Sequence, residues 1–539
     1  MDYKVKYDGR GDFPDEIVAN IQKNRGIDDK FLRPTAKDLL PLDALKNVDK
    51  AYDLLMDAIN TGTSVAILAD TDADGITSGT IMYRYIEEIT PIEAEVEPYI
   101  CINHGKKHGL CKDEDYFEGL KNYRLLIVVD SLNSGIDEYK ELVNSGVKII
   151  VLDHHNINPE VPYDDYVTLV SSQRDYDNPQ LSGAGVVWKF CKYCDMRNKT
   201  NDADEFVDLA AIGIAADVMD MTVMENRYIV YEGLQHLNNP AVKKIVGSYE
   251  FNSRGILFSV APLINAANRM DQNDVALEAL LEISDKSLRK EMRVFKKCKT
   301  DQDDKVTKAI ESMQNEVEDQ INDDAKFLFV GAEDISGLSG LIATKLASKY
   351  DRPVFVVSDC GGEYKGSLRC NNSFNLAEAV NNSGLATASG HEGAAGFSIK
   401  AENVIAFEEY MNKALENQTA DMTIEVDVQL DADDFSMALV HKIHDIDYVS
   451  GKNFQPITFL VDGVEDYEVS TFKDGKHLVL NCGSHLTIVK WNSPYDIDEF
   501  NDGAMFHTPL RASGTIQIGG FGANRKTWLI ADEIELLEE

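Results

Sequence analysis

Three carboxylates on alternate residues are the first candidates for chemistry in this chain. Asp70, Asp72 and Asp74 follow residues 65–68, an apolar run that predicts a buried strand. Carboxylates this close repel and raise one another's pKa, so a bound cation would stabilise the cluster. Carboxylate oxygens suit hard ions such as Mg²⁺, Mn²⁺ or Ca²⁺. Taken alone, the run is equally compatible with a solvated acidic turn.

Further polar residues follow other apolar runs. Asp130 ends one run, and Asp153, His154 and His155 end the next. Strands separated by helical patterns predict parallel βαβ units, and such sheets hold ligands at the carboxyl ends of their strands. The three sites should therefore meet at one edge of a sheet. Asp217 follows a helix-like run, and it is a candidate only in combination with the other acidic residues.

In chain order, these motifs resemble those of the DHH phosphoesterase superfamily. They read ADTDADG at 69–75, VVDS at 128–131, LDHH at 152–155 and AADVMD at 215–220. Three later runs resemble signatures of the RecJ branch of single-stranded-DNA exonucleases, namely GAGV at 183–186, PLINAANR at 262–269 and GSLR at 366–369. Residues 389–397 read SGHEGAAGF and resemble the GGHxxAAGF motif of the associated DHHA1 domain. The resemblance covers nearly the whole chain.

The chain departs from the family pattern at three places. Leu68 stands where some members have a His, which leaves part of that role to Asp70. The second motif continues as Ser-Leu-Asn after Asp130, where the family often has Cys-Gly. Asn268 stands where the family usually has Gly. None of these departures removes a charged metal ligand.

The resemblance implies two metal ions in one site, with Asp130 bridging them. The implied ligands are Asp70, Asp72, Asp74, Asp130, His154 and Asp217. Carboxylates mixed with one imidazole suit Mn²⁺ better than Ca²⁺, and Mg²⁺ is the alternative ion. Asp153 is expected to orient an imidazole ring by hydrogen bonding. His155 is expected to contact phosphate rather than metal.

The resemblance also implies substrate contacts from a second domain. His391 is expected to reach the scissile phosphate across an interdomain cleft, and it joins Asp130 and His155 as a catalytic candidate. The alternative for His391 is a buried position in a packed Gly–Ala corner. The implied substrate-binding residues are His108, Asn265, Arg269, Arg369, Gly390 and His391. Arginine suits this task because its guanidinium can bind phosphate through two parallel hydrogen bonds.

The expected fold class is α/β, with a C-terminal all-β barrel. A parallel-sheet DHH domain with an N-terminal lead-in (1–250) is followed by a connecting segment with a long helix (251–325), a smaller α/β DHHA1 domain (326–420) and an OB-fold barrel (421–539). Residues 284–322 are polar and helix-periodic, which is also compatible with a solvated bundle helix. Alternating apolar and polar residues after position 422 predict the strands of the barrel. OB-folds bind single strands by base stacking and backbone charge.

Composition sets further bounds on the chain. Its 539 residues suffice for several domains, no apolar stretch reaches the length of a membrane span, and the first 13 residues contain no apolar signal core. Eight scattered cysteines, including the pair Cys191 and Cys194, predict ordinary thiols in a reducing cytoplasm. The net charge of −39 argues against nucleic-acid binding unless a local basic groove exists. A monomer without membrane contact is expected.

The resemblance implies a metal-dependent exonuclease that hydrolyses single-stranded DNA from 5′ to 3′ and releases 5′-mononucleotides. Its role would lie in recombination and repair, with a single-strand-binding protein or a helicase as candidate partners. One alternative is a DHH phosphodiesterase acting on short oligonucleotides or cyclic dinucleotides, but such substrates need no barrel. The other is a non-enzymatic replication scaffold, which would have no physical need for clustered acids.

Overall fold

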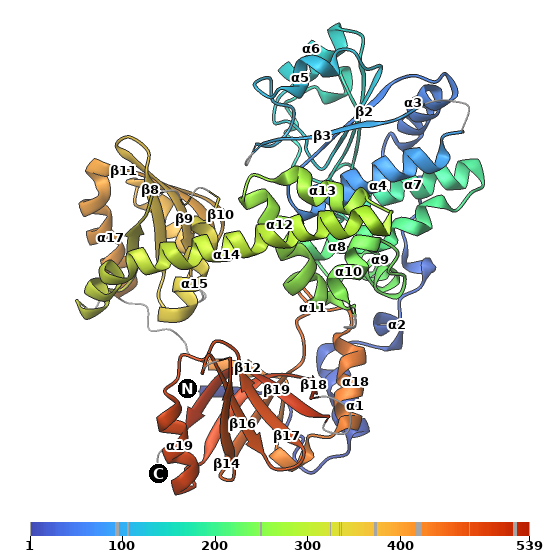
Figure 1. Ribbon diagram of the computed structural model, residues 1–539. Helices are drawn as coiled ribbons and strands as arrows, with labels where there is room; N and C mark the ends of the chain where they lie inside the picture. Colours follow the sequence, from blue (N-terminus) through green and yellow to red (C-terminus); the bar gives the residue numbers. More distant parts are fainter. Residues whose placement is uncertain are drawn as a thin grey trace.

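The chain folds into three regions, each built around its own sheet, and a long helix spans two of them (Figure 1). This computed structural model describes residues 2–537 except 92–95, 105–106, 248–250, 324, 334, 336, 371–373, 417–422, 474 and 521–524. Among the described residues, no helix combines the length and the apolar character that a membrane span requires.

A parallel five-stranded sheet organises the first region. Its order is β3-β2-β4-β5-β6, and every neighbouring pair is parallel. The strands are β2 Val65–Ala69, β3 Tyr99–Ile102, β4 Leu125–Val129, β5 Lys148–Asp153 and β6 Thr168–Ser171. β2 and β4 are buried along their whole length, which explains why they read as unbroken apolar runs. The predicted parallel sheet is confirmed, and three polar strand ends lie at one edge of it.

Helices cover this sheet and deliver the fourth polar motif. α4 (Ala73–Ile89) begins directly after β2 and packs against α7 (Gly183–Asn198) and α8 (Val207–Ala216). Because α8 ends at Ala216, Asp217 follows at its carboxyl end. The other helices of this region are α3 Val48–Asn60, α5 Tyr116–Leu120, α6 Asp137–Asn144, α9 Met224–Gln235 and α10 Pro240–Val246.

A run of helices leads out of the first region. It consists of α11 Ser253–Gly255, the π-helical turn η5 Ile256–Val260, α12 Ala261–Arg269, α13 Asn273–Leu281 and α14 Asp285–Asn322. α14 confirms the long helix predicted over 284–322. It is not a solvated bundle helix: Leu288 and Phe295 are buried in the core of the first region, and Met313 is buried in the core of the second.

The second region holds a mixed five-stranded sheet in the order β10-β11-β9-β8-β7. β7 and β8 are parallel and the other pairs are antiparallel. The strands are β7 Leu328–Gly331, β8 Val354–Asp359, β9 Glu363–Arg369, β10 Ala386–His391 and β11 Ala394–Lys400. The helices are α15 Ser339–Tyr350, α16 Leu376–Asn382 and α17 Val404–Glu416. This is the smaller α/β unit that the sequence predicts.

The third region is a barrel with two helices. Its sheet order is β13-β14-β18-β19-β17-β16-β15. The strands are β13 Val428–Leu430, β14 Thr458–Val464, β15 Glu468–Phe472, β16 His477–Cys482, β17 Leu486–Lys490, β18 Leu510–Gly519 and β19 Lys526–Leu536. α18 (Met437–Asp447) precedes β14, and α19 (Ile497–Phe506) lies between β17 and β18. β14 and β15 are separated by only three residues yet lie near opposite ends of the strand order, so the chain from β14 to β15 crosses between the two ends of the sheet, as the first strand of an OB-fold does.

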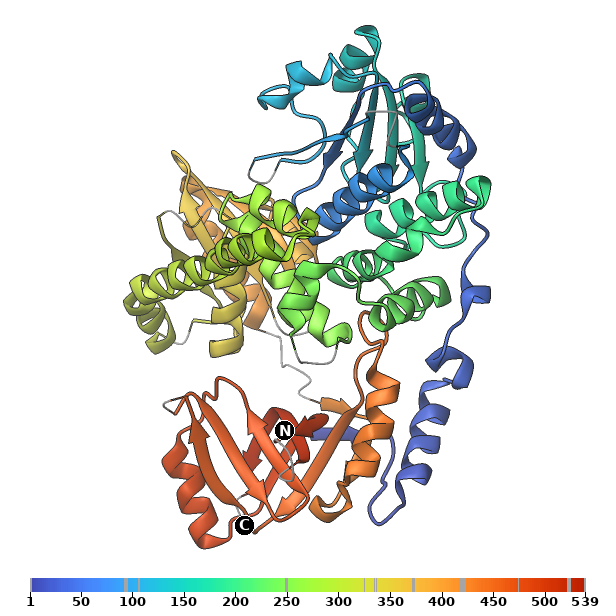
Figure 2. The same ribbon diagram turned by 45° about the vertical axis from the view of Figure 1, so that its right-hand side comes forward.

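The first residues of the chain belong with the last region, which differs from the expected lead-in of a domain spanning 1–250. β1 (Asp2–Val5) pairs in parallel with β12 (Thr423–Val426). α1 (Pro14–Arg25) packs against α18, and its Arg25 side chain donates to both carboxylate oxygens of Asp427. Figure 2 shows the segment after α1 passing along one side of the molecule, from the barrel to the first region.

Arg227 on α9 joins three parts of the chain. Its side chain is fully buried, and it donates to the carbonyl oxygens of Phe31 and Val449. The guanidinium lies 3.8 Å from the ring centre of Phe31 and 4.7 Å from that of Phe454. Burial lowers the pKa of Arg227 to about 9. The lead-in, the first region and the barrel therefore meet around one buried cation held by carbonyls and aromatic rings.

We expect Arg227→Met to lower the free energy of unfolding by about 2–4 kcal/mol, because two buried carbonyls lose their donor and two rings lose a cation. The measurement is denaturant unfolding of the full chain. Arg293→Met is the matched control: Arg293 is exposed on α14, and its change should stay within about 0.5 kcal/mol. Equal stability of the Arg227 variant and the parent would contradict this account of the junction.

Candidate metal centre and interdomain cleft

The turn after β2 directs its three carboxylates toward the edge of the sheet. Asp72 is the N-cap of α4 and accepts from the amide of Gly75 at 3.0 Å. Asp74 is buried and accepts from the Ser182 hydroxyl and from the first two amides of α7, at 2.7–3.0 Å. The positive end of α7 therefore holds the carboxylate of Asp74 in place.

Asp130 follows β4 in a left-handed backbone conformation, with φ of 53°. Its side chain is 2% exposed, and Oδ1 has no hydrogen-bond partner among the described residues. The space around it is tight: a Cβ on Gly183 would lie 2.5 Å from the same Oδ1. A buried carboxylate oxygen without a donor is costly, and a strained non-glycine residue of this kind is typical of functional sites. The arrangement fits an oxygen that faces a cation.

His154 stands at the centre of the acidic residues. Its Nε2 lies 3.2 Å from Asp130 Oδ1, 3.5 Å from Asp217 Oδ2 and 3.7 Å from Asp74 Oδ2. Burial lowers the pKa of His154, although the charge of Asp74 acts in the opposite sense. A neutral imidazole has a free lone pair, which is the form that binds metal.

His155 has a different environment from its neighbour. Its Nδ1 lies 3.1 Å from Asp153 Oδ1, and its backbone amide also donates to Asp153. Burial alone would lower the pKa of His155, but the hydrogen bond and charge of Asp153, together with other nearby carboxylates, raise it to about 9. The pKa shifts of the two adjacent histidines thus have opposite signs: the environment of His154 favours the neutral ring, and that of His155 favours the protonated ring.

Three carboxylates of the site, Asp72, Asp130 and Asp217, carry raised pKa values. Burial, followed by the charges of Asp70 and Asp74, raises the pKa of Asp72 to about 6. Burial and the charges of Asp74 and Asp72 raise the pKa of Asp217 to about 8. The pKa of Asp130 is also raised, for the same two reasons. Without a cation, the site is therefore unfavourable in its fully ionised form.

Three groups of ligand atoms lie close enough to share an ion. Within each group the atoms are no more than 4.8 Å apart, and the groups are Asp70, Asp72 and Asp130; Asp74, His154 and Asp217; and Asp130, His154 and His155. Asp130 belongs to two of them. Carboxylate oxygens with an imidazole nitrogen are a donor set that suits a divalent ion. The structure thus brings together every residue that the sequence suggests as a ligand.

A cleft of about 400 Å³ opens over this cluster, between the first and second regions. Asp70, Asp72, Lys107, His108, Asn265, Asn268 and Arg269 line it from one side, and Gly337, Gly340, Ser367 and Arg369 line it from the other. His108 Nδ1 lies 3.4 Å from Asp70 Oδ2, and its ring centre lies 4.5 Å from that of His155. Arg269 and Arg369 both line the cleft. Burial, followed by the charge of Arg269, lowers the pKa of Arg369.

His391 and Gly390 are not brought into this cleft. His391 ends β10 at the tip of a hairpin and is exposed, so it does not occupy the packed corner considered as its alternative. A neighbouring cavity of about 550 Å³ shares Ser367 and Arg369 with the cleft and is lined by Ser389 and Gly396 of the same hairpin. The hairpin therefore lines the neighbouring cavity, which adjoins the cleft through Ser367 and Arg369.

Two residues near the cluster of candidate metal ligands are not predicted as site residues from the sequence. Asn268 donates to the Thr71 hydroxyl at 3.0 Å, between two of the clustered carboxylates. Ser182 donates to Asp74. The only signal for Asn268 is its departure from the family's usual Gly. Nothing in the sequence marks Ser182 beyond its place before the helix start, where serine is a common N-cap.

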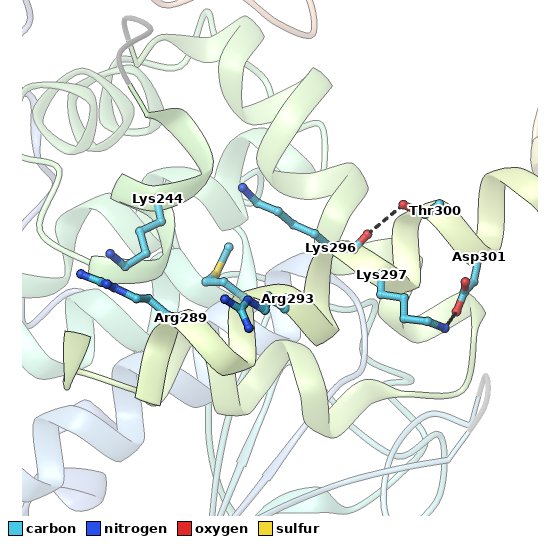
Figure 3. A pocket seen from close by; sticks show the side chains of 8 residues that line it. Lys244, Arg289, Arg293, Lys296, Lys297, Thr300 and Asp301 are labelled. Carbon is cyan, nitrogen blue, oxygen red and sulfur yellow. Dashed lines mark hydrogen bonds and ion pairs between the residues drawn. The ribbon is translucent and has the colours of Figure 1, made fainter. Parts of the chain in front are cut away.

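A separate cationic concavity of about 730 Å³ lies between α10 and α14 (Figure 3). It is lined by Lys244, Arg289, Met292, Arg293, Lys296, Lys297, Thr300 and Asp301. Lys297 pairs with Asp301 at 2.5 Å, whereas Arg293 and Lys296 have no carboxylate partner among the residues that the structure describes. This is a local concentration of positive charge in a chain whose net charge is −39.

Comparison with known proteins agrees with this architecture. Residues 64–214 match the DHH family, N-terminal domain, and residues 303–417 match the DHHA1 domain. The chain is 30% identical over 467 residues to a Bacillus subtilis protein provisionally named SPbeta prophage-derived single-strand DNA-specific exonuclease YorK, covering 80% of this chain and 78% of that one. It is 26% identical over 551 residues to the single-stranded-DNA-specific exonuclease RecJ of Bacillus subtilis, covering 97% and 68% respectively.

A solved structure extends the match to the fold. The crystal structure of RecJ from Thermus thermophilus in complex with Mn²⁺ aligns with a TM-score of 0.74 at 22% identity, covering 97% of this chain and 76% of that one. The ordered motifs, the two matched domains and the identity to relatives along most of the chain agree with one another. The chain therefore belongs to the RecJ-like members of the DHH family, with an associated DHHA1 domain and a C-terminal OB-fold.

Proposed function

We propose that this protein is a metal-dependent exonuclease that hydrolyses single-stranded DNA. The observation that carries the proposal is the buried cluster of carboxylates around His154, placed below a cleft whose two walls contribute Arg269 and Arg369. Phosphodiester hydrolysis needs these two elements, a site for cations and a set of positive groups for the phosphate. The names of the RecJ relatives support the substrate class. The 5′ to 3′ direction, the release of 5′-mononucleotides and a role in recombination and repair rest on the same resemblance.

We propose two ions, Mn²⁺ by preference, as the cofactor. One ion would be held by Asp72 and Asp70. The other ion would be held by Asp74, His154 and Asp217. Asp130 would be a ligand of both ions. Such a pair, when bound, lowers the pKa of a water molecule and neutralises charge on the phosphoryl oxygens. Asp130 suits the bridging role because it belongs to two of the three ligand groups.

The other side chains of the cleft position and stabilise the phosphate. The raised pKa of His155 favours its protonated form, so this ring is suited to contact a non-bridging oxygen, with Asp153 fixing its orientation. Arg269 and Arg369 would hold phosphate from opposite walls, where exclusion of water strengthens each interaction. His108 and Asn265 line the same space. A catalytic role for His391 requires the β10–β11 hairpin to move toward the cleft.

Cleavage of end-labelled strands tests the function. We expect Mn²⁺-dependent release of mononucleotides from single strands, with duplex and dinucleotides degraded far more slowly. Asp130→Asn should lower the rate on the order of 10³-fold or more while the protein stays folded, because the shared ligand of both ions is lost. Asp164→Asn, at an exposed ion pair with Arg174, is the control and should keep full activity. Near-normal turnover by the Asp130 variant in excess Mn²⁺ would exclude the assignment.

The metal site should be visible in the pH dependence of stability. Because the folded-state pKa values of Asp72 and Asp217 are raised to about 6 and about 8, the metal-free fold binds protons more tightly than the unfolded chain. The contribution of these two residues to stability is therefore fully present at pH values below the unfolded-state pKa of an aspartate, and it is lost as pH rises through about 6 for Asp72 and about 8 for Asp217. Mn²⁺ binds the deprotonated ligands, so it should raise the melting temperature more at high pH than at low pH.

Asp447 supplies the control for this experiment. It is half-buried at the end of α18, far from the cluster in the sequence, and desolvation raises its pKa to about 7, so it contributes to the same trend without metal. Asp447→Asn should leave the Mn²⁺-dependent rise in melting temperature intact, whereas Asp217→Asn should reduce it. A rise that is independent of pH, or equal in both variants, would contradict a metal site built on Asp217.

The second wall of the cleft can be tested separately. Arg369→Ala should lower kcat by about 10²–10³-fold, the usual cost of removing a fixed stabiliser of developing charge. The Mn²⁺-dependent thermal shift should not change, because Arg369 is not among the ligands. Lys349→Ala, at the end of α15 and outside the cleft, is the matched control. Unchanged kcat in the Arg369 variant would mean that the first region acts alone.

A further inference from the structure

One side of the helical run before α14 stays accessible along its length. η5 continues into α12 without a break in helical backbone. From position 258 to 269, the residues that are not buried are Phe258, Ser259, Pro262, Asn265, Asn268 and Arg269. Their spacing of three or four places them on one helical face. The intervening residues are buried against the first region, so this face looks away from it.

This face connects the cleft with the barrel. At one end, Asn265, Asn268 and Arg269 line the cleft above the candidate metal ligands. At the other end, Arg254 of α11 donates to the Thr515 hydroxyl on β18 at 3.1 Å. A helical rise gives about 16 Å from Phe258 to Arg269. The face is thus a short, continuous surface between the proposed active site and the strand-binding fold.

Phe258 is the unusual member of the face. Its side chain is 74% exposed, and the guanidinium of Arg254 lies 6.0 Å from its ring centre. It sits on a π-helical turn, a rare geometry that often occurs at functional sites. An exposed ring beside a cation is the combination by which proteins hold single strands, through base stacking and a phosphate contact.

We propose that this face carries the single strand between the cleft and the barrel, with a nucleobase stacked on Phe258 and phosphates next to Arg254 and Arg269. The inference deepens the proposed function and rests on it for the class of ligand. Local cations matter here because the net charge of −39 would otherwise repel a polyanion. The concavity of Figure 3 offers cations on another face, but no aromatic side chain lines it.

Stacking can be measured on the full-length protein without metal. The probe is a single-stranded oligonucleotide of about 12 nucleotides that carries 2-aminopurine at successive positions, bound in EDTA so that it is not cleaved. We expect fluorescence quenching at one position a few nucleotides from the end held in the cleft. Phe258→Ala should abolish that quenching and weaken binding roughly 5- to 150-fold, the range for one lost base–aromatic stack.

Three comparison variants sharpen the result. Phe258→Trp should restore quenching and affinity, whereas Phe258→Leu should restore neither, because it keeps apolar bulk without a ring. Phe13→Ala removes an aromatic residue of similar exposure near the start of α1 and should leave binding unchanged. Lys296→Ala removes a cation of the concavity in Figure 3 and should lower affinity less than Phe258→Ala does.

The outcomes separate this inference from the proposed function. Wild-type affinity and quenching in the Phe258→Ala variant, or no binding of the oligonucleotide by the parent protein, would overturn the inference. A larger loss of affinity from Lys296→Ala than from Phe258→Ala would overturn the inference and indicate that the strand binds in the concavity of Figure 3. Phe258-dependent binding without Mn²⁺-dependent cleavage would refute the proposed nuclease activity, and the proposed binding of the strand along this face would still hold. Mn²⁺-dependent cleavage with binding that does not depend on Phe258 would support the nuclease activity and overturn the inference about this face.

Discussion

Mutual repulsion among buried carboxylates is the constraint around which the first region is built. Asp74, Asp130 and Asp153 are almost completely buried at one sheet edge, where each charge is expensive. The fold offsets this cost locally. The positive end of α7 holds Asp74, and His155 with the Leu132 amide holds Asp153. Asp130 alone has an oxygen without a donor. Of these three carboxylates, Asp130 is therefore the one whose charge the protein compensates least.

Small residues make this crowding sterically feasible. A Cβ on Gly213 would lie 2.2 Å from Asp74 Oδ1, and one on Gly183 would lie 2.5 Å from Asp130 Oδ1. α7 and α8 thus approach the carboxylates closely because these positions lack side chains. The metal motifs and the glycines of the neighbouring helices form one structural unit, although they are far apart in the sequence.

Local patterns were sufficient to predict the sheet edge and the polar residues that meet there, whereas their assignment as metal ligands came from the family resemblance and stays a prediction. Unbroken apolar runs place Asp130 and Asp153 at strand ends, and parallel connections bring such ends together. Contacts that depend on long-range packing were not accessible in this way. Asn268 reaches Thr71 only because α12 returns over the turn after β2, and the exposed position of His391 depends on how a hairpin is set beside the cleft. Exposure of Phe258 likewise follows from which face of a helix is covered.

The pairing of β1 with β12 has a consequence for the order in which the chain can fold. About 420 residues separate the partners, as in the ion pair between Lys4 and Glu425. A ribosome would release the lead-in long before the barrel exists, so these residues must wait without their partner strand while two other regions fold. Completion of the β1–β12 sheet is thus coupled to a region that is synthesised after the other two. The same coupling means that cutting away the barrel would also strip the first strand of its sheet, so the C-terminal region is not a detachable module.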